Sequence, residues 1–301
     1  MKKIVRSPLQ NPALQGEDKS GSVLTYNKPR LLGRGCRRFI LALFLLSLAV
    51  KGYAAVDFNE KKSSHFIIYY DKDVSEEFVN SVSEFAERYY DELTEKLGFV
   101  RYDFWTWEKR AKIYIYPDQE IYVRETKQPA WSSGMAAYDQ KTIWTYPRES
   151  GFFDSLLPHE IGHIVFREAI GSHEVPLWLE EGVACYLEKA KRYGSEKIVL
   201  EAIKNNTFIP LKELSQIDTP ALKQRSDVEL FYAESVNVVT YLIEKFGPGI
   251  FSDFCRKIKD GRSFEDALAY AYFDIRNLGD LSEFWEKSLR DKLKSKNQAI
   301  L

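Results

Sequence analysis

The sequence predicts an α+β fold in which a small mixed sheet with an edge strand precedes a mainly helical C-terminal half. Two observations carry this prediction. Short apolar segments with strand character lie between His65 and Pro147, and an apolar periodicity of three to four residues continues from Phe152 almost to the end of the chain. Strands followed by helices are typical of folds in which the helices pack against one side of the sheet.

The domain boundaries follow from the same pattern. No repeat, low-complexity tract or Gly/Ser linker interrupts the 301 residues. We expect residues 55–171 to form the mixed α/β half and residues 172–301 to form the helical half. Their boundary is expected near Gly171, inside one compact unit. Residues 1–54 are expected to be a signal peptide or an N-terminal anchor.

Each strand and the first helix have local signals. The continuous apolar and aromatic run at 65–70 predicts a strand. Apolar residues between 74 and 97 recur at helical steps, and Gly98 ends that helix. Residues 111–118 alternate in polarity and end at a proline, and residues 132–147 are typical of a hairpin turning near Asp139. Helices are expected at 153–170, 176–192, 228–246, 249–260, 263–273 and 280–295.

The N-terminal segment has the composition of an export signal. Residues 1–54 carry ten Lys and Arg against two acids, and Arg37 and Arg38 precede a predominantly apolar run at 39–50. As a helix this run would be about 18 Å long, too short for a bilayer core of about 30 Å. We expect a signal cleaved after Ala54, although its lead is long, or an anchor through residues 39–50. Either form predicts an exported protein that is periplasmic, secreted or anchored on the outer side of a membrane.

The charge of the chain argues against a nucleic-acid partner, and its cysteine content leaves the question of a disulfide open. The chain from residue 55 onward has a net charge of about −9 and no basic stripe, so we expect no nucleic-acid partner. Cys185 and Cys255 are the two cysteines of this part. They are either a disulfide or two buried thiols, because two cysteines do not define a disulfide framework.

The segment at 157–166, LPHEIGHIVF, carries the pattern His-Glu-x-x-His. Positions i and i+4 share one face of a helix, so His159 and His163 can direct two imidazoles at one metal ion. Glu160 lies beside that pair and can act as general base on a hydrolytic water. The pattern predicts a zinc site with one Zn²⁺, against the alternative that both histidines make ordinary hydrogen bonds in a core. Pro158 indicates that the helix begins or kinks just before the ligands.

A catalytic zinc commonly has three protein ligands, and the third is less evident. The metzincin pattern is excluded because Phe166 and Ala169 stand where it requires Gly and His. His173 lies in a predicted turn and matches no ligand spacing that we can justify, so we expect it to be a surface histidine. The segment at 175–188 remains, where a second helix can cross the first and present a carboxylate.

On these two segments the chain resembles the gluzincin metallopeptidases of the peptidase MA-like family. The family pairs HExxH with W-L-x-E-G, and this chain has that pattern from Trp178 to Gly182. The resemblance covers residues 65–295 and implies a zincin-like fold and hydrolysis of peptide bonds. It also implies that Glu181, directly before the glycine, is the third ligand and that Glu180 is the variable position.

The same resemblance suggests supporting groups. Gluzincins place a Tyr or His opposite the base to donate a hydrogen bond to the oxyanion, and Tyr232 is the candidate, with Tyr186 and Tyr241 as alternatives. Glu188 is a candidate hydrogen-bond partner for a ligand histidine. A substrate peptide is expected along the edge strand, whose candidate contacts are Gly134, Met135, Ala136 and Ala137.

The sequence therefore predicts an exported zinc-dependent metallopeptidase that acts on peptides or proteins. The aminopeptidase N branch binds the free amine of its substrate with the Glu of G-x-M-E-N, and this chain has no acid in the comparable stretch. Its absence favours an endopeptidase. Two alternatives stay open: a catalytically silent, peptidase-like module that binds peptides or proteins in the envelope, and a zinc hydrolase acting on another substrate.

Overall fold

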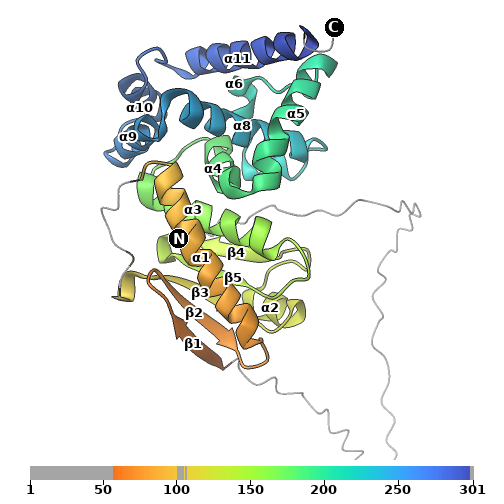
Figure 1. Cartoon of the computed structure of the whole chain (residues 1–301), viewed down its shortest axis with the longest axis vertical. Coiled ribbons are helices and arrows are strands. Elements are labelled where there is room, and N and C mark those ends of the chain that lie inside the picture. Colours follow the sequence, from red (N-terminus) through yellow and green to blue (C-terminus); the bar gives the residue numbers. More distant parts are fainter. Residues whose placement is uncertain (1–56, 100–104, 106, 299–301) are drawn as a thin grey trace, which may run out of the picture. The chain divides into compact units, whose positions relative to one another are not determined.

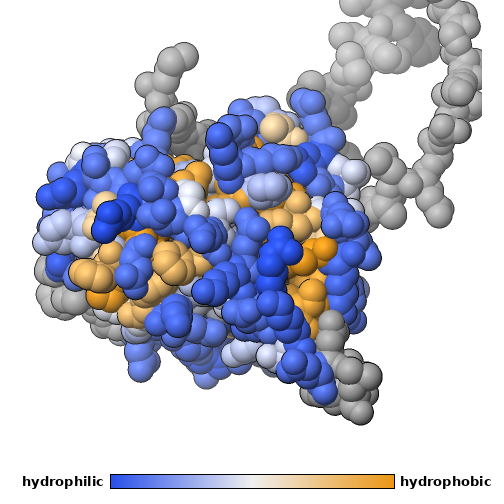
Figure 2. Space-filling model, turned by 90° about the horizontal axis from the view of Figure 1, so that it is seen from above, coloured by the Kyte–Doolittle hydropathy of each residue, from blue (hydrophilic) through white to orange (hydrophobic). Residues whose placement is uncertain are grey.

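The computed structural model describes residues 57–99, 105 and 107–298 (Figure 1). The predicted signal or anchor at 1–54 lies outside these residues. Among the helices of the described part, none combines the length and apolarity needed to cross a bilayer. On the face shown in Figure 2, patches of apolar side chains are separated by hydrophilic ones.

Five strands form one mixed sheet. Its two inner pairs, β2–β3 and β3–β5, are parallel, and its two outer pairs are antiparallel. The strand β4 has β5 as its one partner in the described chain, so the predicted edge strand precedes the ligand helix as expected. In the order β1-β2-β3-β5-β4, the strands are Phe58–Lys62, Phe66–Asp71, Ala111–Ile115, Thr142–Thr145 and Gly134–Ala137.

Two elements of this half were not anticipated. Strand β1 is short and polar, FNEKK, and carries no apolar alternation that would distinguish it from a loop. Helix α2, Gln119–Thr126, is capped by the Asp118 carboxylate, which accepts from the Ile121 N–H at 2.8 Å. The expected helix α1, Glu76–Lys96, connects β2 to β3 and is capped by Ser75.

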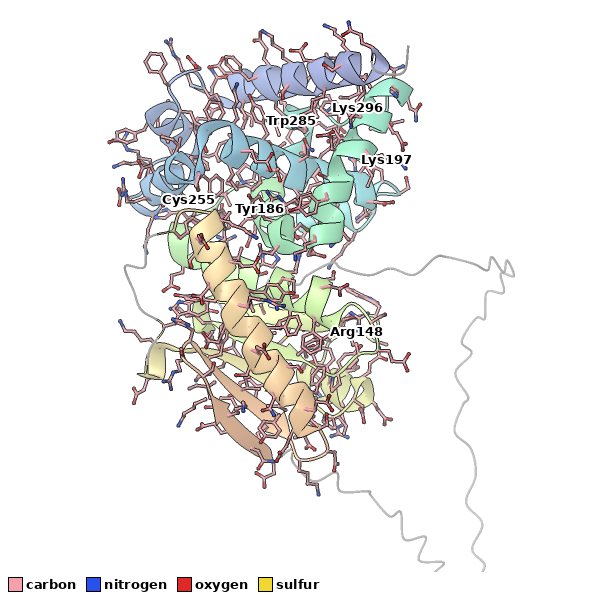
Figure 3. All side chains as sticks on the ribbon, in the orientation of Figure 1. Arg148, Tyr186, Lys197, Cys255, Trp285 and Lys296 are labelled. Carbon is pink, nitrogen blue, oxygen red and sulfur yellow. The ribbon has the colours of Figure 1, made fainter. Side chains whose placement is uncertain are left out.

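The helical half confirms the predicted α+β class. Trp285 lies on the terminal helix (Figure 3), and its Nε1 donates to Asn237 Oδ1 of α8 at 2.9 Å. The helices are α3 (Leu157–Ile170), α4 (Leu177–Ala184), α5 (Lys189–Asn205), α6 (Leu211–Leu214), α7 (Thr219–Leu222), α8 (Val228–Phe246), α9 (Pro248–Lys259), α10 (Phe264–Ala271) and α11 (Leu278–Gln298).

The prediction of one helix over 176–192 is wrong. Helix α4 ends at Ala184, a 3₁₀ turn covers Cys185–Leu187, and α5 starts after Glu188, whose backbone is not helical (φ −71°, ψ 89°). No glycine or proline marks this break in the sequence. The Glu188 side chain at this break instead makes tertiary hydrogen bonds with His159 and Ser155.

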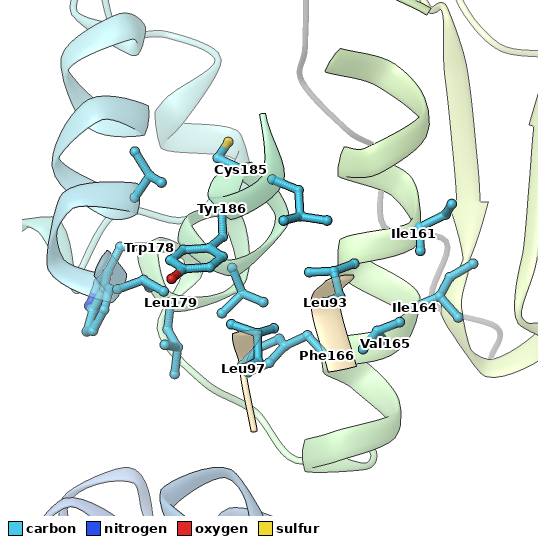
Figure 4. Packing of buried hydrophobic residues seen from close by; sticks show 14 of the residues in the cluster. Leu93, Leu97, Ile161, Ile164, Val165, Phe166, Trp178, Leu179, Cys185 and Tyr186 are labelled. Carbon is cyan, nitrogen blue, oxygen red and sulfur yellow. The ribbon is translucent and has the colours of Figure 1, made fainter. Parts of the chain in front are cut away.

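The core around α3 joins both halves of the chain. Buried Ile161, Val165 and Phe166 of α3 pack with Leu93 at the end of α1 and Leu179 of α4 (Figure 4). Burial of a large apolar side chain contributes about 1.5–3 kcal/mol, so this cluster fixes α3 in place. The two sequence patterns that are predicted to bind metal therefore lie on tightly packed elements.

Two glycines set how closely these helices approach. A Cβ on Gly162 of α3 would lie 2.9 Å from the Ala184 Cα at the end of α4. A Cβ on Gly182 of α4 would lie 2.4 Å from the Ser235 carbonyl oxygen and 2.7 Å from a methyl of Val239, both on α8. The glycine of the W-L-x-E-G pattern thus permits backbone contact between α4 and α8.

We expect Gly182→Ala to destabilise the fold by about 2–3 kcal/mol, because the added methyl meets main-chain atoms that cannot rotate away. Urea unfolding measures the change. Gly194→Ala in α5 is the matched control: nothing lies within 4 Å of its Cβ position, so this change should stabilise by about 0.5–1 kcal/mol. Equal unfolding midpoints for wild type and Gly182→Ala would contradict the packing described here.

Glu234 of α8 is expected to make stability depend on pH. Its Oε1 accepts from the Ile209 N–H at 3.0 Å, its Oε2 is buried, and burial raises its pKa to about 8. Between the unfolded pKa near 4.5 and pH 8, only the folded state keeps the proton. This group therefore lowers stability by about 1.4 kcal/mol per pH unit as the pH rises.

Glu234→Gln keeps an oxygen that can accept from the Ile209 N–H but has no proton to lose. It should remove this group's contribution to the pH dependence of stability, which unfolding curves from pH 5 to 8 measure. Exposed Glu229→Gln on the same helix is the control. A wild-type slope that persists in Glu234→Gln would contradict the assignment.

Candidate metal centre and active site

A π-helical turn, Phe152–Leu156, leads into α3. In this turn the Leu156 N–H donates to the Gly151 carbonyl, five residues earlier. Pro158 then lies in the first turn of α3, where its missing N–H is tolerated. His159, Glu160 and His163 follow on the buried side of this helix. Of the two alternatives predicted from Pro158, the α-helix thus begins just before the predicted ligands, directly after the π-helical turn.

Three side chains converge at one point between α3 and α4. His159 Nε2 lies 3.1 Å from His163 Nε2 and 3.6 Å from Glu181 Oε2, and the remaining side, from His163 Nε2 to Glu181 Oε2, is 3.8 Å. Four ligands at about 2.0–2.1 Å in a tetrahedron stand about 3.3–3.4 Å apart. The triangle of three nitrogen and oxygen atoms therefore has the size of one face of a zinc site.

The protonation state of these groups also suits a cation. Burial lowers the pKa of His159, and burial together with His159 lowers that of His163 well below its usual range. The imidazoles are thus neutral, the form that binds metal, and their contacts with Glu181 are not ion pairs. Burial and the charge of Glu180 raise the pKa of Glu181 well above normal, so a divalent cation would relieve the crowding of carboxylates.

The two glutamates of the W-L-x-E-G pattern point to different partners. Glu181 is buried, and its Oε2 has no hydrogen-bond partner among the described residues. Glu180 instead accepts two hydrogen bonds from the Arg167 guanidinium, the Nε bond to Oε1 being 2.8 Å long. Arg167 also donates to the His173 carbonyl at 3.0 Å, so His173 lies with Arg167 and not with the convergent triad.

Glu188 is the partner of the first histidine. Its Oε1 lies 2.9 Å from His159 Nδ1 and accepts from Lys191 Nζ at 2.9 Å, while its Oε2 accepts from the Ser155 hydroxyl. Burial opposes ionisation, but these contacts outweigh it and lower the pKa of Glu188 to about 2. A permanent carboxylate on Nδ1 orients the ring so that Nε2 faces the point of convergence.

Glu160 lies beside the triad and is fully buried. Neither of its carboxylate oxygens has a hydrogen-bond partner within the described residues. Burial and the nearby charge of Glu188 raise its pKa to about 8. A carboxylate with this affinity for a proton can accept one from water and release it to a leaving group near neutral pH.

Two tyrosines flank this centre. Tyr232 of α8 is 5% exposed, its hydroxyl has no partner in the described chain, and burial and the charge of Glu181 raise its pKa. Of the alternatives, Tyr186 packs under the Arg192 guanidinium and Tyr241 against Phe246, away from the triad. Tyr138, which sequence analysis missed, stacks on His163 with ring centroids 5.0 Å apart. The one feature of the sequence that could have pointed to Tyr138 is its position directly after the predicted edge strand.

The candidate substrate contacts on β4 are all buried. Gly134 and Met135 pair with Thr145 and Trp144 of β5 in an antiparallel register. The opposite edge of β4 pairs with no other described strand. A position at the sheet edge beside α3 is compatible with the predicted role, which stays a prediction.

The cysteines remain thiols. Cys185 and Cys255 are buried, and neither forms a disulfide within the described residues. Cys185 Sγ lies 3.7 Å from His159 Nδ1, on the side of Glu188 and not on the side of the triad.

The described residues thus combine a small mixed sheet followed by helices with the HExxH pattern on α3 and Glu181 on α4. A model of the peptidase MA superfamily matches residues 105–291, more than half of the chain. The chain belongs to this superfamily, which confirms the expected peptidase MA-like family and supports a metallopeptidase-type function with a peptide or protein substrate.

The comparison with curated proteins found no match. Among solved structures, yeast LTA4 hydrolase in complex with bestatin is similar, with a TM-score of 0.40 and 16% sequence identity. The match covers 78% of this chain and 38% of the hydrolase, so this chain spans well under half the length of that protein.

Proposed function

We propose that this chain is a zinc endopeptidase of the gluzincin type. The observation that carries the proposal is the buried triangle of His159, His163 and Glu181. Glu160 lies beside it, and neither oxygen of the Glu160 carboxylate has a hydrogen-bond partner in the described residues. Membership of the peptidase MA superfamily supports it. Zinc, when bound, would supply Lewis acidity that makes water nucleophilic near neutral pH.

The residues of the chain have distinct roles in this proposal. His159, His163 and Glu181 hold the metal, and Glu160 takes a proton from the attacking water and passes it to the leaving amine. The Tyr232 hydroxyl donates to the oxyanion that develops on the carbonyl. The main chain of Gly134, Met135, Ala136 and Ala137 holds the peptide extended along β4.

Endopeptidase action and export are parts of the same proposal. No acidic side chain stands at 134–137 to bind the free amine of a substrate, which favours cleavage within a chain. The basic lead and apolar run at 1–54 support export, either with cleavage after Ala54 or with anchoring through residues 39–50. N-terminal sequencing of the secreted or membrane fraction tests this part.

The central test combines metal content and cleavage. Purified wild type should contain one zinc per chain and cleave peptides from a proteome-derived library whose two termini are blocked. A chelator should abolish cleavage, and one equivalent of zinc should restore it. Stoichiometric zinc without cleavage of any peptide would contradict the proposal.

Glu188→Gln is expected to weaken zinc binding about 10- to 100-fold, because the neutral amide no longer fixes and polarises the His159 ring. Competition with a chromogenic chelator measures this affinity. Glu196→Gln is the control, since Glu196 accepts from Lys292 and Lys296 at the surface of α5. Unchanged affinity in Glu188→Gln would show that the contact at 2.9 Å has no effect on the metal.

A further inference from the structure

Helix α5 begins with cations at a place where helices favour acidic residues. Its first turn contains Lys189, Lys191 and Arg192 and no acid. The free N–H groups at the start of a helix carry partial positive charge, so these cations are unfavourable for the helix alone. Arg192 is paired with Glu244 at 2.9 Å, and Lys189 is exposed. Lys191 differs from both, because its ammonium group contacts buried side chains beside the metal centre.

The Lys191 ammonium is anchored by the carboxylate that orients the first ligand histidine. Lys191 Nζ donates to Glu188 Oε1 at 2.9 Å, and the same oxygen lies 2.9 Å from His159 Nδ1. Glu188 Oε2 accepts from the Ser155 hydroxyl, so three groups hold this buried carboxylate. A charged hydrogen bond to a carboxylate that is itself fixed gives the ammonium group a defined place.

The same ammonium lies over the ring of Tyr232. The distance from Lys191 Nζ to the ring centroid is 5.0 Å, within the range of about 6 Å that a cation–π interaction covers. The face of an aromatic ring carries partial negative charge, so the cation attracts the ring and restrains its plane. Tyr232 is 5% exposed, so water screens this attraction only in part.

The hydroxyl end of Tyr232 lacks a comparable restraint. Its oxygen is buried and makes no hydrogen bond within the described residues. Phe231 packs edge to face on the ring, with centroids 5.6 Å apart, but this contact does not fix the hydroxyl. A donor to a developing oxyanion must be held within about 0.5 Å of its productive place. The direction of this hydroxyl therefore depends on the groups that hold the ring, and Lys191 is the charged one.

We propose that Lys191 is a positioning residue for Tyr232: its ammonium group, anchored on Glu188, holds the ring so that the hydroxyl is directed at the substrate carbonyl. The proposal rests on the function proposed above and adds a residue to its machinery. One carboxylate then serves both parts of the centre, since Glu188 contacts the first ligand directly and the oxyanion donor through Lys191. This role also accounts for an unfavourable cation in the first turn of α5.

Lys191→Met keeps the aliphatic stem and removes the charge. It should lower kcat about tenfold and change KM less than about twofold, because the misplaced hydroxyl stabilises the oxyanion less well. Lys191→Arg keeps a cation that can stack on the ring and should retain kcat within about threefold of wild type. Initial rates on a quenched fluorescent peptide measure both quantities. Lys197→Met removes an exposed cation farther along α5 and is the matched control, which should keep wild-type kcat and KM (Figure 3).

Combination with Tyr232→Phe identifies the route of the effect. In that background Lys191→Met should lower kcat less than about twofold, since the hydroxyl that it positions is absent. Zinc affinity, measured by competition with a chromogenic chelator, should fall less than about tenfold, because Glu188 keeps its contacts with His159 and Ser155. Losses in kcat that multiply, or a zinc affinity that falls together with kcat, would overturn the proposal.

Crystal structures of wild type and Lys191→Met give a second measurement that does not require turnover. The Tyr232 ring should be displaced in the variant, and an unmoved ring would overturn the proposal. Urea unfolding verifies that the variant folds, and Lys191→Gln, which is also neutral, replaces it if it does not. If wild type cleaves nothing, the proposed function fails, and the place of the ring still decides whether Lys191 positions it. If wild type cleaves peptides and Tyr232→Phe keeps wild-type kcat, positioning of an oxyanion donor is overturned while the proposed function stands.

Discussion

Glu160→Gln should lose about 10³-fold in kcat while still binding one zinc per chain. The amide has the size of the carboxylate but cannot accept a proton from water or deliver it to the leaving amine. The metal should stay, because Glu160 is not part of the triangle formed by His159, His163 and Glu181. Initial rates on a quenched fluorescent peptide and zinc analysis on the same sample measure both quantities.

A matched control addresses burial. Glu234→Gln also removes a buried carboxyl group, one that lies on α8 and bonds the Ile209 N–H. It should keep wild-type kcat, so a loss confined to Glu160→Gln reports chemistry and not a general effect of a buried amide. Residual activity within tenfold of wild type in Glu160→Gln would exclude Glu160 as the base and favour a zinc hydrolase of another design.

Glu181→Gln should weaken zinc binding by more than about 100-fold, a larger loss than a residue that only orients a ligand produces. The neutral amide is a poorer ligand, and the buried site loses the negative charge that offsets the cation. Metal titration against a competing chelator measures the change, and kcat measured without added zinc should fall with it.

The adjacent Glu180→Gln is the matched control on the same helix. It breaks the pairing with Arg167 and leaves Oε2 of Glu181 facing the histidines. This variant should bind zinc as wild type does and lose stability instead, because the Arg167 charge is left without its carboxylate. If Glu180→Gln loses zinc and Glu181→Gln retains it, the ligand assignment is reversed.

Local signals account for most of the elements that the sequence predicted. The apolar periodicity of 228–246 predicts the extent of α8, and Gly247 and Pro248 mark its C-terminal end. The hairpin of β4 and β5 was predicted from the segment at 132–147 with its turn near Asp139. Strand β1 has neither signal: it is defined by main-chain pairing with β2, which its polar side chains do not reveal.

Some parts of the site also have a local sequence signal, and others do not. The convergence of His159 and His163 depends on helical geometry, which the spacing of four residues encodes. The break at Glu188 depends on partners 29 and 33 positions earlier, His159 and Ser155, so no local pattern announces it. The stacking of Tyr138 on His163 likewise brings together two segments that are separate in the sequence.

The close approach at Gly162 and Gly182 has a consequence for how the enzyme could change over evolution. Three helices meet there through main-chain atoms, so the separation between imidazoles and carboxylate is set by the backbone and hardly depends on which apolar side chains surround it. Drift in the neighbouring core should therefore alter the stability of the chain long before it alters the spacing of the donor atoms. A centre anchored in this manner needs little reorganisation when a cation arrives, since its donors are already held at nearly the required spacing.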